Sequence, residues 1–561
     1  MAGTQSPEPV TSPVPVNPPA PWWHHAVIYQ VYVRSFADSD GDGIGDLPGI
    51  TAHLDHLVEL GVDALWITPF YRSPQHDHGY DVADYRAVDP LFGSLGDADA
   101  LVARAHELGL RVIVDIVPNH TSSGHAWFLA ALAAGPGSPE RGRYLFRDGQ
   151  GPGGDQPPNN WLSVFGGLAW DRVVEADGSP GQWYLHLFDS SQPDLDWRNP
   201  EVRAEFEDVL RFWLDRGVDG FRIDVAHSLI KVADLRDQIR DSDDRTAPIL
   251  TDEGALVDPH VEDEPMWDQS EVHDIYRDWH RVLAAYPGDR MTVAEAWTRT
   301  PESMARYVRP DELSQSFNFA WLSTGWSAEA FRQVIEDTFS ALDPVGSPPT
   351  WVLSNHDVIR HVTRYGGGER GLARARAGTL TMLGLPGSAY LYQGEELGLE
   401  QADVPVEARQ DPIALRTGEV GRDGCRVPLP WGGTEPPYDF GPGVGQPWLP
   451  QPSDWAGLTV AAQAADPAST FSFYRAALRL RRLLPAEGIV MATSDPAGVL
   501  SYTRGDVRVV LNTGTVPVPL PAGDVLIASG PISQSGLSQS GSSQSGLSLP
   551  PDTAVWLRGG A

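Results

Sequence analysis

The sequence predicts an α/β protein: a (β/α)8 barrel with an inserted subdomain after its third strand and an antiparallel β domain at its C-terminal end. Three observations lead to this fold. Between residue 26 and about residue 398, eight short apolar runs alternate with amphipathic stretches. Residues 121–199 interrupt this rhythm, and the apolar runs after residue 485 have no helices between them. The alternation indicates a closed parallel barrel, with a long open parallel sheet as the alternative.

The predicted strands and helices follow in order along the chain. The strands are expected at residues 26–33, 63–68, 110–120, 219–224, 291–297, 313–319, 351–357 and 387–396. Between them, residues 50–60 have one apolar face and are followed by Gly61, which is typical of a helix and its end. Residues 201–216 carry a second apolar stripe, and residues 470–484 predict a last helix before the β domain.

Composition shifts divide the chain into four parts. Residues 1–22 contain seven prolines and no apolar core, so we expect a disordered tail rather than a signal peptide. The barrel is expected at 23–120 and 200–485. The interval 121–199 lacks clean helices, is rich in Gly, Pro and Trp, and is too long for a loop, which predicts a small subdomain. Residues 486–561 predict the β domain, with a low-complexity insert of "SQSG" repeats at about 529–549.

Charge and cysteine content narrow the function. The 75 acidic residues against 41 basic ones give a net charge of −34, which disfavours nucleic acid and anionic membranes as partners. The single cysteine, Cys425, excludes an intrachain disulfide. No apolar run approaches the length of a membrane span. We therefore expect a soluble cytoplasmic protein.

Polar residues gather at the predicted carboxyl ends of four strands, where barrels of this kind place their active sites. They are Asp115, Asn119, His120, Arg222, Asp224, Glu295, His356 and Asp357. Arg222 and Asp224 are two apart, so they point the same way, and the guanidinium should keep this carboxylate ionised as a nucleophile requires. Glu295 follows the apolar run "MTVA", whose desolvation should raise its pKa and suit it as a general acid.

Each of these residues alone has an ordinary structural explanation. A strand-end carboxylate is more often a helix cap or an ion-pair partner, and a single histidine is more often structural than catalytic. Together, however, carboxylates facing one cavity are the groups that hydrolyse glycosidic bonds. The set therefore favours a glycoside hydrolase.

The stretch "DSDGDGIGD" at 38–46 resembles a calcium loop but not a complete EF-hand. Its aspartates alternate as in such a loop, whereas Gly49 stands where a bidentate Glu should close the site. The residues before it predict a strand and not a helix. A solvated Gly/Asp turn is the alternative, but the density of acids favours a divalent cation.

Four motifs carry a resemblance to a known family. "DIVPNH" (115–120), "GFRIDVAH" (220–227), "AEAW" (294–297) and "SNHD" (354–357) are similar, in order and spacing, to the signature regions of the α-amylase superfamily of glycoside hydrolases. "QPDLDW" (192–197), "DHGYDVADY" (77–85) and "GRDGCRVPLPW" (421–431) resemble segments of its α-glucosidase and oligo-1,6-glucosidase branch, especially of actinobacterial α-glucosidases. The likeness covers roughly residues 22–560.

The resemblance implies a role for each matching residue. Asp224 would be the nucleophile, Glu295 the acid/base and Asp357 the third carboxylate. The substrate-binding residues would be Asp77, Tyr80, His120, Arg222, His356 and Arg426, with Arg422 a second choice for closing the pocket. Asp115 would orient Arg222 or His120, and Asn119 would be structural. The aspartate-rich loop would hold a structural calcium ion, with magnesium less suitable, through Asp38, Asp40, Asp42, Asp46 and the Ile44 carbonyl.

The implied activity is an exo-acting retaining α-glucosidase for maltose and short α-1,4-linked oligosaccharides, with α-glucoside oligosaccharides as its substrates. The Trp-rich insert should wall one side of the pocket. Val225 resembles α-1,6-cleaving enzymes, so an oligo-1,6-glucosidase is one alternative. A glucosyl-transferring isomerase, such as a trehalose synthase or sucrose isomerase, is another. A non-catalytic relative is disfavoured, because the motifs are intact and no membrane helix is expected.

Overall fold

The computed structural model describes residues 20–239, 264–442, 445–486, 488–534 and 546–559. Its centre is an eight-stranded parallel sheet in the spatial order β11-β10-β9-β5-β2-β1-β13-β12. These strands are β1 (Val27–Val31), β2 (Ala64–Ile67), β5 (Arg111–Ile116), β9 (Gly220–Ile223), β10 (Met291–Ala294), β11 (Gln315–Ser316), β12 (Thr350–Val352) and β13 (Ser388–Tyr392). Just after β11, the backbone N–H of Asn318 donates to the Thr350 carbonyl at 3.0 Å and so links the two end strands of this order, β11 and β12. The predicted barrel is therefore confirmed over the open sheet.

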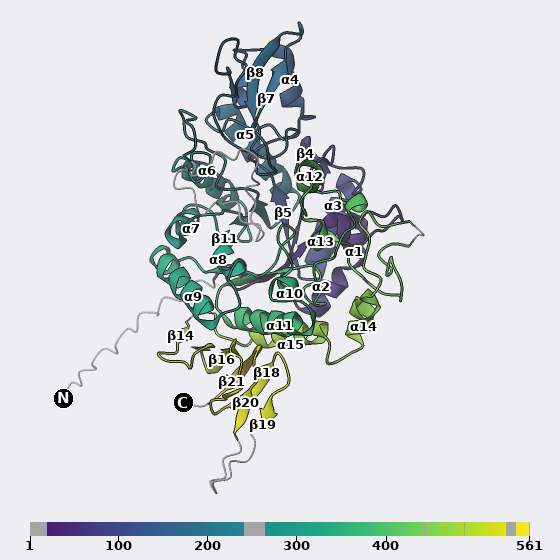
Figure 1. Cartoon of the computed structure of the whole chain (residues 1–561), viewed down its shortest axis with the longest axis vertical. Coiled ribbons are helices and arrows are strands. Elements are labelled where there is room, and N and C mark those ends of the chain that lie inside the picture. The colour runs from purple at the N-terminus through teal and green to yellow at the C-terminus, as the bar shows by residue number, and fades with distance from the viewer. Residues whose placement is uncertain (1–19, 240–263, 443–444, 487, 535–545, 560–561) are drawn as a thin grey trace, which may run out of the picture.

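The barrel strands are buried on both faces, which explains why they read as continuous apolar runs. Helices surround them (Figure 1). The helix predicted at 201–216 is α5 (Pro200–Asp215), which Asn199 caps by accepting a hydrogen bond from the Glu201 amide. The helix predicted at 50–60 is instead two helices, α1 (Leu47–Ala52) and α2 (Leu54–Leu60). They separate at His53, whose Nδ1 lies 2.8 Å from the Gly49 carbonyl oxygen.

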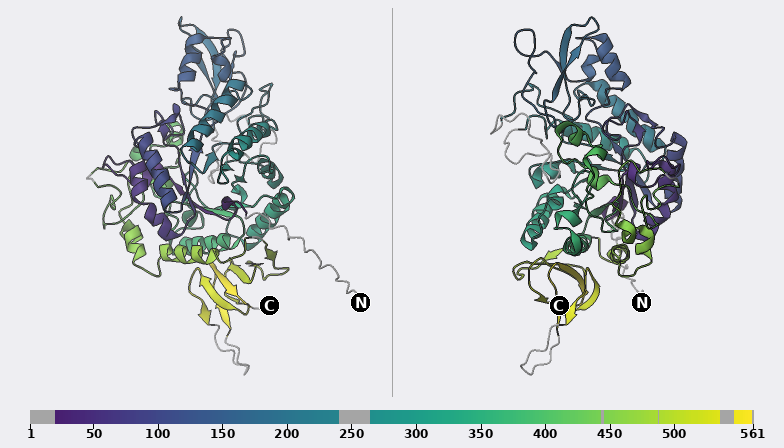
Figure 2. Two further views of the ribbon diagram at one scale, coloured as in Figure 1. Left: turned by 180° about the vertical axis from the view of Figure 1, so that it is seen from behind. Right: turned by 45° about the vertical axis from the view of Figure 1, so that its right-hand side comes forward.

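The inserted subdomain has its own antiparallel sheet in the order β6-β8-β7: β6 (Phe146–Arg147), β7 (Trp170–Val174) and β8 (Pro180–Leu185). The prediction that this interval has no clean helix is wrong, because α4 covers Ala126–Ala134. Its sequence "AWFLAALAA" is apolar almost throughout, so no amphipathic period marked it as a helix. The subdomain and the C-terminal domain lie at opposite ends of the barrel in all views (Figures 1 and 2).

The C-terminal domain contains two antiparallel sheets. One has the order β14 (Val490–Met491), β15 (Val499–Arg504), β16 (Val507–Asn512), β21 (Thr553–Arg558), β18 (Asp524–Ala528), and the other has β17 (Val518–Pro519), β20 (Leu547–Leu549), β19 (Ser533–Gln534). The domain packs on α11 (Gly368–Gly384), to which the Trp556 indole donates a hydrogen bond at the Leu380 carbonyl. The last predicted helix is α15 (Thr470–Arg481), which begins at the predicted residue and ends before the predicted residue 484.

Two expectations fall at the edges of the described ranges. Residues 1–19 of the predicted tail and the middle of the "SQSG" segment lie outside the described residues. The ends of that segment form β19 and β20, so it is not irregular throughout. At the other end, Trp22 begins a short 3-10 helix, and its indole donates to the Asp289 carbonyl at 3.0 Å. Among the described helices, none combines the length and apolar character that crossing a bilayer requires.

Candidate active site

One buried guanidinium binds three carboxylates at the carboxyl end of the barrel. Arg222 Nη1 lies 2.9 Å from Asp115 Oδ1 and 2.5 Å from Asp224 Oδ1, and Nη2 lies 2.7 Å from Glu295 Oε2. The register explains this convergence, because β9 pairs with β5 on one side and with β10 on the other. The Trp66 ring lies beneath the guanidinium, with Cζ 5.1 Å from its centroid. Asp115 therefore contacts Arg222, one of the two residues that it is expected to orient.

Two carboxylates of this cluster, Asp224 and Asp115, have raised pKa values. Burial raises the pKa of Asp224, Arg222 lowers it, and the adjoining Glu295 and Asp115 carboxylates raise it again, so that it lies well above its usual range. Burial also raises the pKa of Asp115 to about 7 against the opposing effect of Arg222. The expectation that Arg222 alone keeps Asp224 ionised was too simple, because one guanidinium serves three acids. Asp224 and Asp115 therefore hold a proton more readily than isolated aspartates do.

A strained backbone turn positions Glu295. Val225 has φ +42°, a left-handed conformation that is costly for a β-branched residue. In this conformation its amide donates to Glu295 Oε2 at 2.9 Å. The other carboxylate oxygen accepts from the Trp297 indole at 3.3 Å. This contact could not be predicted from the sequence, since Val is an ordinary strand residue.

Two arginines and a histidine surround Asp357. Its Oδ1 accepts hydrogen bonds from Arg422 Nη1 at 3.1 Å and from Arg426 Nη2 at 2.9 Å. Burial opposes the charged form, but His356 and the two guanidiniums outweigh it and hold the pKa of Asp357 well below its usual range. Arg422 also reaches Asp77 Oδ1 at 3.0 Å and Asp411 Oδ2 at 2.8 Å.

The structure reverses the expected order of the two arginines. Arg422 lines the pocket, whereas Arg426 is buried beside it and binds the His356 carbonyl. Asp411, the N-cap of α12 (Pro412–Thr417), binds Arg422 and was not identified from the sequence. It follows no predicted strand, and its pairing depends on how two loops meet.

The histidines and Tyr80 lie close to these acids. The Tyr80 hydroxyl donates to Asp115 Oδ2 at 3.1 Å, and its ring stacks on His356 with centroids 5.3 Å apart. The Gln30 amide donates to His356 Nδ1 at 2.6 Å, which leaves Nε2 facing Asp357 Oδ2 at 3.2 Å. His120 Nε2 lies 3.2 Å from Gln192 Nε2, which donates to Asp77. Burial lowers the pKa of His120 to about 4, so it is neutral.

A single pocket collects most of the predicted substrate and catalytic residues. It is lined by Asp77, Tyr80, His120, Val164, Phe165, Phe188, Asp224, Val225, Glu295, Trp297, His356, Asp357 and Arg422. The inserted subdomain does wall one side, but through Phe165 and Phe188 rather than through tryptophans. Its residues Trp161, Trp170 and Trp197 are buried in the core. Asn119 stays behind the pocket, where Ser228 and Lys231 both donate to its side-chain oxygen at 2.6 Å.

The aspartate-rich loop directly precedes α1. Carboxylate oxygens of Asp38, Asp40 and Asp42 lie within 4.8 Å of one another. Within the described ranges no Arg or Lys pairs with them, so the donor set suits a hard cation. Asp46 differs from our expectation. Its carboxylate accepts from Gly49 N at 2.6 Å and from Ser39 N at 2.9 Å, and so caps α1 instead of joining the cluster.

In this (β/α)8 barrel, the carboxylates of Asp224 and Glu295 follow neighbouring strands and meet at one guanidinium in a pocket. Such a fold and site define a glycoside hydrolase. Comparison with known families agrees with this class: residues 30–486 match the family described as alpha amylase, catalytic domain. The chain belongs to the alpha-amylase family, in its α-glucosidase branch.

Several relatives match over most of their length. The chain is 40% identical over 504 residues to a probable alpha-glucosidase of Rhizobium meliloti (strain 1021), covering 87% of this chain and 88% of the relative. It is 36% identical to an oligo-1,6-glucosidase of Heyndrickxia coagulans, covering 82% and 85%. Among solved structures, the alpha-glucosyl transfer enzyme XgtA superposes with a TM-score of 0.83 at 38% identity, covering 96% of this chain and 100% of that one.

The Arg422 contacts predict a change in pH dependence. Burial raises the pKa of Asp77 to about 6, and Arg422 lowers it. Arg422→Gln should therefore raise the pKa of Asp77 further, so that less of it is ionised at any acidic pH. We expect the acid limb of kcat/KM for an α-glucoside to move to higher pH, measured between pH 4 and pH 8. Arg409 lies before α12, on the other side of that helix from Arg422, and among the described residues its side chain bonds only to carbonyls, so Arg409→Gln should leave the limb in place. An unmoved limb in Arg422→Gln would contradict the prediction.

Proposed function

We propose that this chain is an exo-acting retaining α-glucosidase, which releases α-glucose from the non-reducing end of maltose and short α-1,4-linked oligosaccharides. The observation that carries the proposal is that Asp224 and Glu295 bind the two terminal nitrogens of the Arg222 guanidinium. Carboxylates held by one planar group are close neighbours. Retaining enzymes need such a separation, about 5 to 5.5 Å, whereas inverting enzymes leave room for a water between the acids.

In the proposed mechanism Glu295 protonates the glycosidic oxygen while Asp224 attacks the anomeric carbon. The bond to the leaving sugar breaks, and a covalent β-glucosyl ester forms on Asp224. Glu295 then takes a proton from water, the oxygen of which displaces the ester and restores the α configuration. The Val225 amide and Trp297 indole orient the Glu295 carboxyl throughout.

The remaining pocket residues are proposed to bind the terminal glucose. Asp357 stays ionised beside its two arginines, so it can accept hydrogen bonds from sugar hydroxyls. Tyr80 offers a ring face for the sugar, and His120 and His356 offer ring nitrogens. The bridge from Arg422 to both Asp77 and Asp357 joins two sides of the pocket. Such a closed end admits a chain terminus, which supports exo action.

Linkage preference is the finer part of the proposal. The likeness of "GRDGCRVPLPW" to actinobacterial α-glucosidases supports α-1,4 bonds. Val225 favours the second candidate, an oligo-1,6-glucosidase, because it lines the pocket directly after Asp224.

Proton NMR of the first product from maltose and from isomaltose, offered separately, tests both candidates. We expect α-glucose to appear before its β anomer and faster from maltose. Faster release from isomaltose would change the assignment to oligo-1,6-glucosidase, and β-glucose as the first product would overturn retention. A product isomeric with the substrate would indicate an isomerase.

We also propose that Asp38, Asp40 and Asp42, with the Ile44 carbonyl, hold a structural calcium ion, which suits them better than magnesium because it accepts more protein oxygens. Burial raises the pKa of Asp42, and the neighbouring Asp40 and Asp38 raise it too, so a cation would relieve their repulsion. Removing calcium with EDTA should lower the Tm by several degrees, and added calcium should restore it. In the Asp40→Asn/Asp42→Asn double variant, EDTA should have no effect. A wild-type Tm that ignores EDTA would contradict the proposal.

A further inference from the structure

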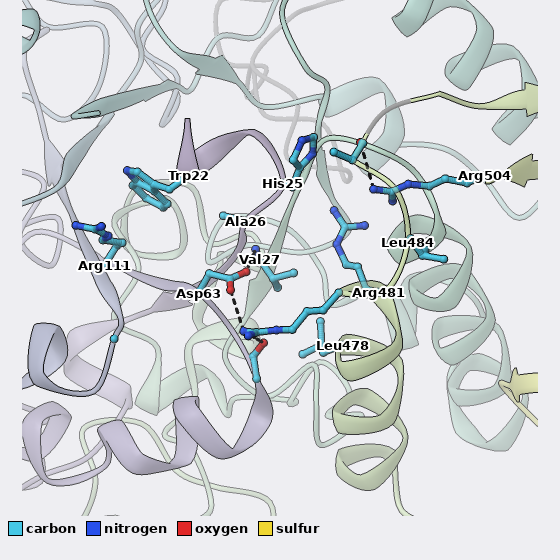
Figure 3. A pocket seen from close by; sticks show the side chains of 14 residues that line it. Trp22, His25, Ala26, Val27, Asp63, Arg111, Leu478, Arg481, Leu484 and Arg504 are labelled. Atoms are coloured by element: carbon cyan, nitrogen blue, oxygen red, sulfur yellow. Dashed lines mark hydrogen bonds and ion pairs between the residues drawn. The ribbon is translucent and has the colours of Figure 1, made fainter. Parts of the chain in front are cut away.

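A second cavity, of about 440 Å³, lies at the amino-terminal end of the barrel strands (Figure 3). Ala26 and Val27 line it at the start of β1, Asp63 just before β2, and Arg111 at the start of β5. Because the carboxylate cluster lies at the opposite, carboxyl ends of the same strands, this cavity is separate from the active site. Helix α15 and, from the C-terminal domain, strand β15 complete the walls of this cavity.

Arginines dominate this cavity, although the chain as a whole is strongly acidic. Its lining contains Arg111, Arg481, Arg482 and Arg504, against the single carboxylate Asp63. That carboxylate is already bound, by Arg482 Nη2 at 2.8 Å and by the Val27 amide at 2.8 Å. Arg111 is paired with a carboxylate outside the lining, Asp219, at 3.0 Å.

The other two arginines have no acidic partner in the described part of the chain. Arg481 donates only to the carbonyls of Leu383, Leu385 and Gly387. Arg504 donates only to the carbonyls of Gly384, Leu385, Pro485 and Ala486. Burial lowers the pKa of Arg481 to about 9, the neighbouring Arg504 charge lowers it too, and Asp63 opposes both only in part. Burial likewise lowers the pKa of Arg504 to about 10. An anion in the cavity would compensate for this desolvation.

The labelled side chains of the cavity fall on two sides. In Figure 3, His25, Arg481 and Arg504 lie together on one side, and Trp22 and Arg111 lie on the other. Both ring nitrogens of His25 are buried, and neither has a hydrogen-bond partner among the residues that the structure describes. Since burial lowers the pKa of His25 to about 4, its ring is neutral and can both donate to and accept from a ligand.

We propose that this cavity binds a small organic phosphate of about the size of a hexose phosphate. Guanidinium groups bind phosphate oxygens in a bidentate manner, which makes arginine the preferred residue for this anion. The volume falls in the range of small-molecule sites, and the Trp22 ring offers a face for the organic part. Because Arg504 belongs to the C-terminal domain, a bound phosphate would join that domain more firmly to the barrel.

Calorimetric titration of the full chain with glucose 6-phosphate tests the proposal. The active site is saturated with 1-deoxynojirimycin, so that only a second site can respond, and ionic strength is held constant with sodium chloride. We expect saturable binding and a rise in Tm of a few degrees, with weaker binding of inorganic phosphate and none of glucose. No binding at millimolar concentration, or equal affinity for inorganic phosphate, would overturn the proposal.

Two variants with opposite expected effects place the ligand in this cavity. Arg482→Gln removes a charge-assisted hydrogen bond and exposes the Asp63 charge, so binding should weaken about tenfold or more. Asp63→Asn removes the one carboxylate of the lining and should strengthen binding, which a folding defect could not mimic. Arg479→Gln, on the same helix but outside the cavity, is the matched control. Equal weakening in Arg479→Gln and Arg482→Gln, or unchanged affinity in Asp63→Asn, would overturn the assignment.

Discussion

Asp224→Ala is expected to lower kcat on maltose by about 10⁴-fold or more, since loss of a covalent nucleophile has effects of this order or larger in other enzymes. The stability of the fold should not fall with it. Asp224 is a buried carboxylate next to two others at a single guanidinium, so its removal relieves repulsion. We therefore expect an unchanged or higher Tm by circular dichroism, together with the loss of turnover.

Sodium azide distinguishes a nucleophile from a residue that only positions the substrate. In Asp224→Ala, azide can enter the space of the missing carboxylate and attack the anomeric carbon, giving β-glucosyl azide from an activated α-glucoside. Asp357→Ala removes a carboxylate from the same pocket but leaves Asp224 in place, so it should give no β-azide. Retention of more than a tenth of wild-type activity in Asp224→Ala would exclude this residue as the nucleophile.

The barrel could be predicted from the sequence because its signals are local. Each strand is a short apolar run, and the functional polar residues stand at the carboxyl ends of these runs, as with Glu295 after "MTVA". Helix α4 was missed because its local signal is absent: an apolar helix has no amphipathic period. The break at His53 was missed because the helical pattern of the sequence continues through it. The side-chain contact from His53 to the Gly49 carbonyl, which accompanies the break, has no signal in that pattern.

The electrostatics of the site could not be predicted, because they arise from contacts between distant residues. Arg422 and Asp77 are 345 positions apart, and Arg222 and Glu295 are 73 apart. Only the closed barrel brings three carboxylates to one guanidinium. The left-handed backbone of Val225 likewise has no sequence signal, since β-branched residues avoid that conformation. The aspartate-rich loop stood out in the sequence, but the hydrogen bonds that commit Asp46 to capping α1 did not.

Glu295→Ala should separate the two steps of the reaction. Maltose hydrolysis is expected to fall by about 10² to 10⁴-fold, the usual contribution of a general acid. A 2,4-dinitrophenyl α-glucoside, by contrast, has a leaving group that needs no proton, so Asp224 can still be glucosylated at close to the wild-type rate. The variant also loses the base that activates water. The glucosyl ester should then accumulate, and mass spectrometry of the intact protein should detect one added glucosyl unit.

The comparison between the two substrates makes this result specific to Glu295. A general loss of structure would slow both substrates alike, whereas loss of the acid slows only the one that needs protonation. Glu302→Gln, an exposed carboxylate on α7 (Pro301–Tyr307), should leave both rates unchanged. Addition of azide should rescue Glu295→Ala through α-glucosyl azide, the opposite anomer to that from Asp224→Ala, because azide then attacks the ester in place of water. Equal losses on both substrates, or β-azide from Glu295→Ala, would mean that the acid and the nucleophile have been assigned the wrong way round or to the wrong residues.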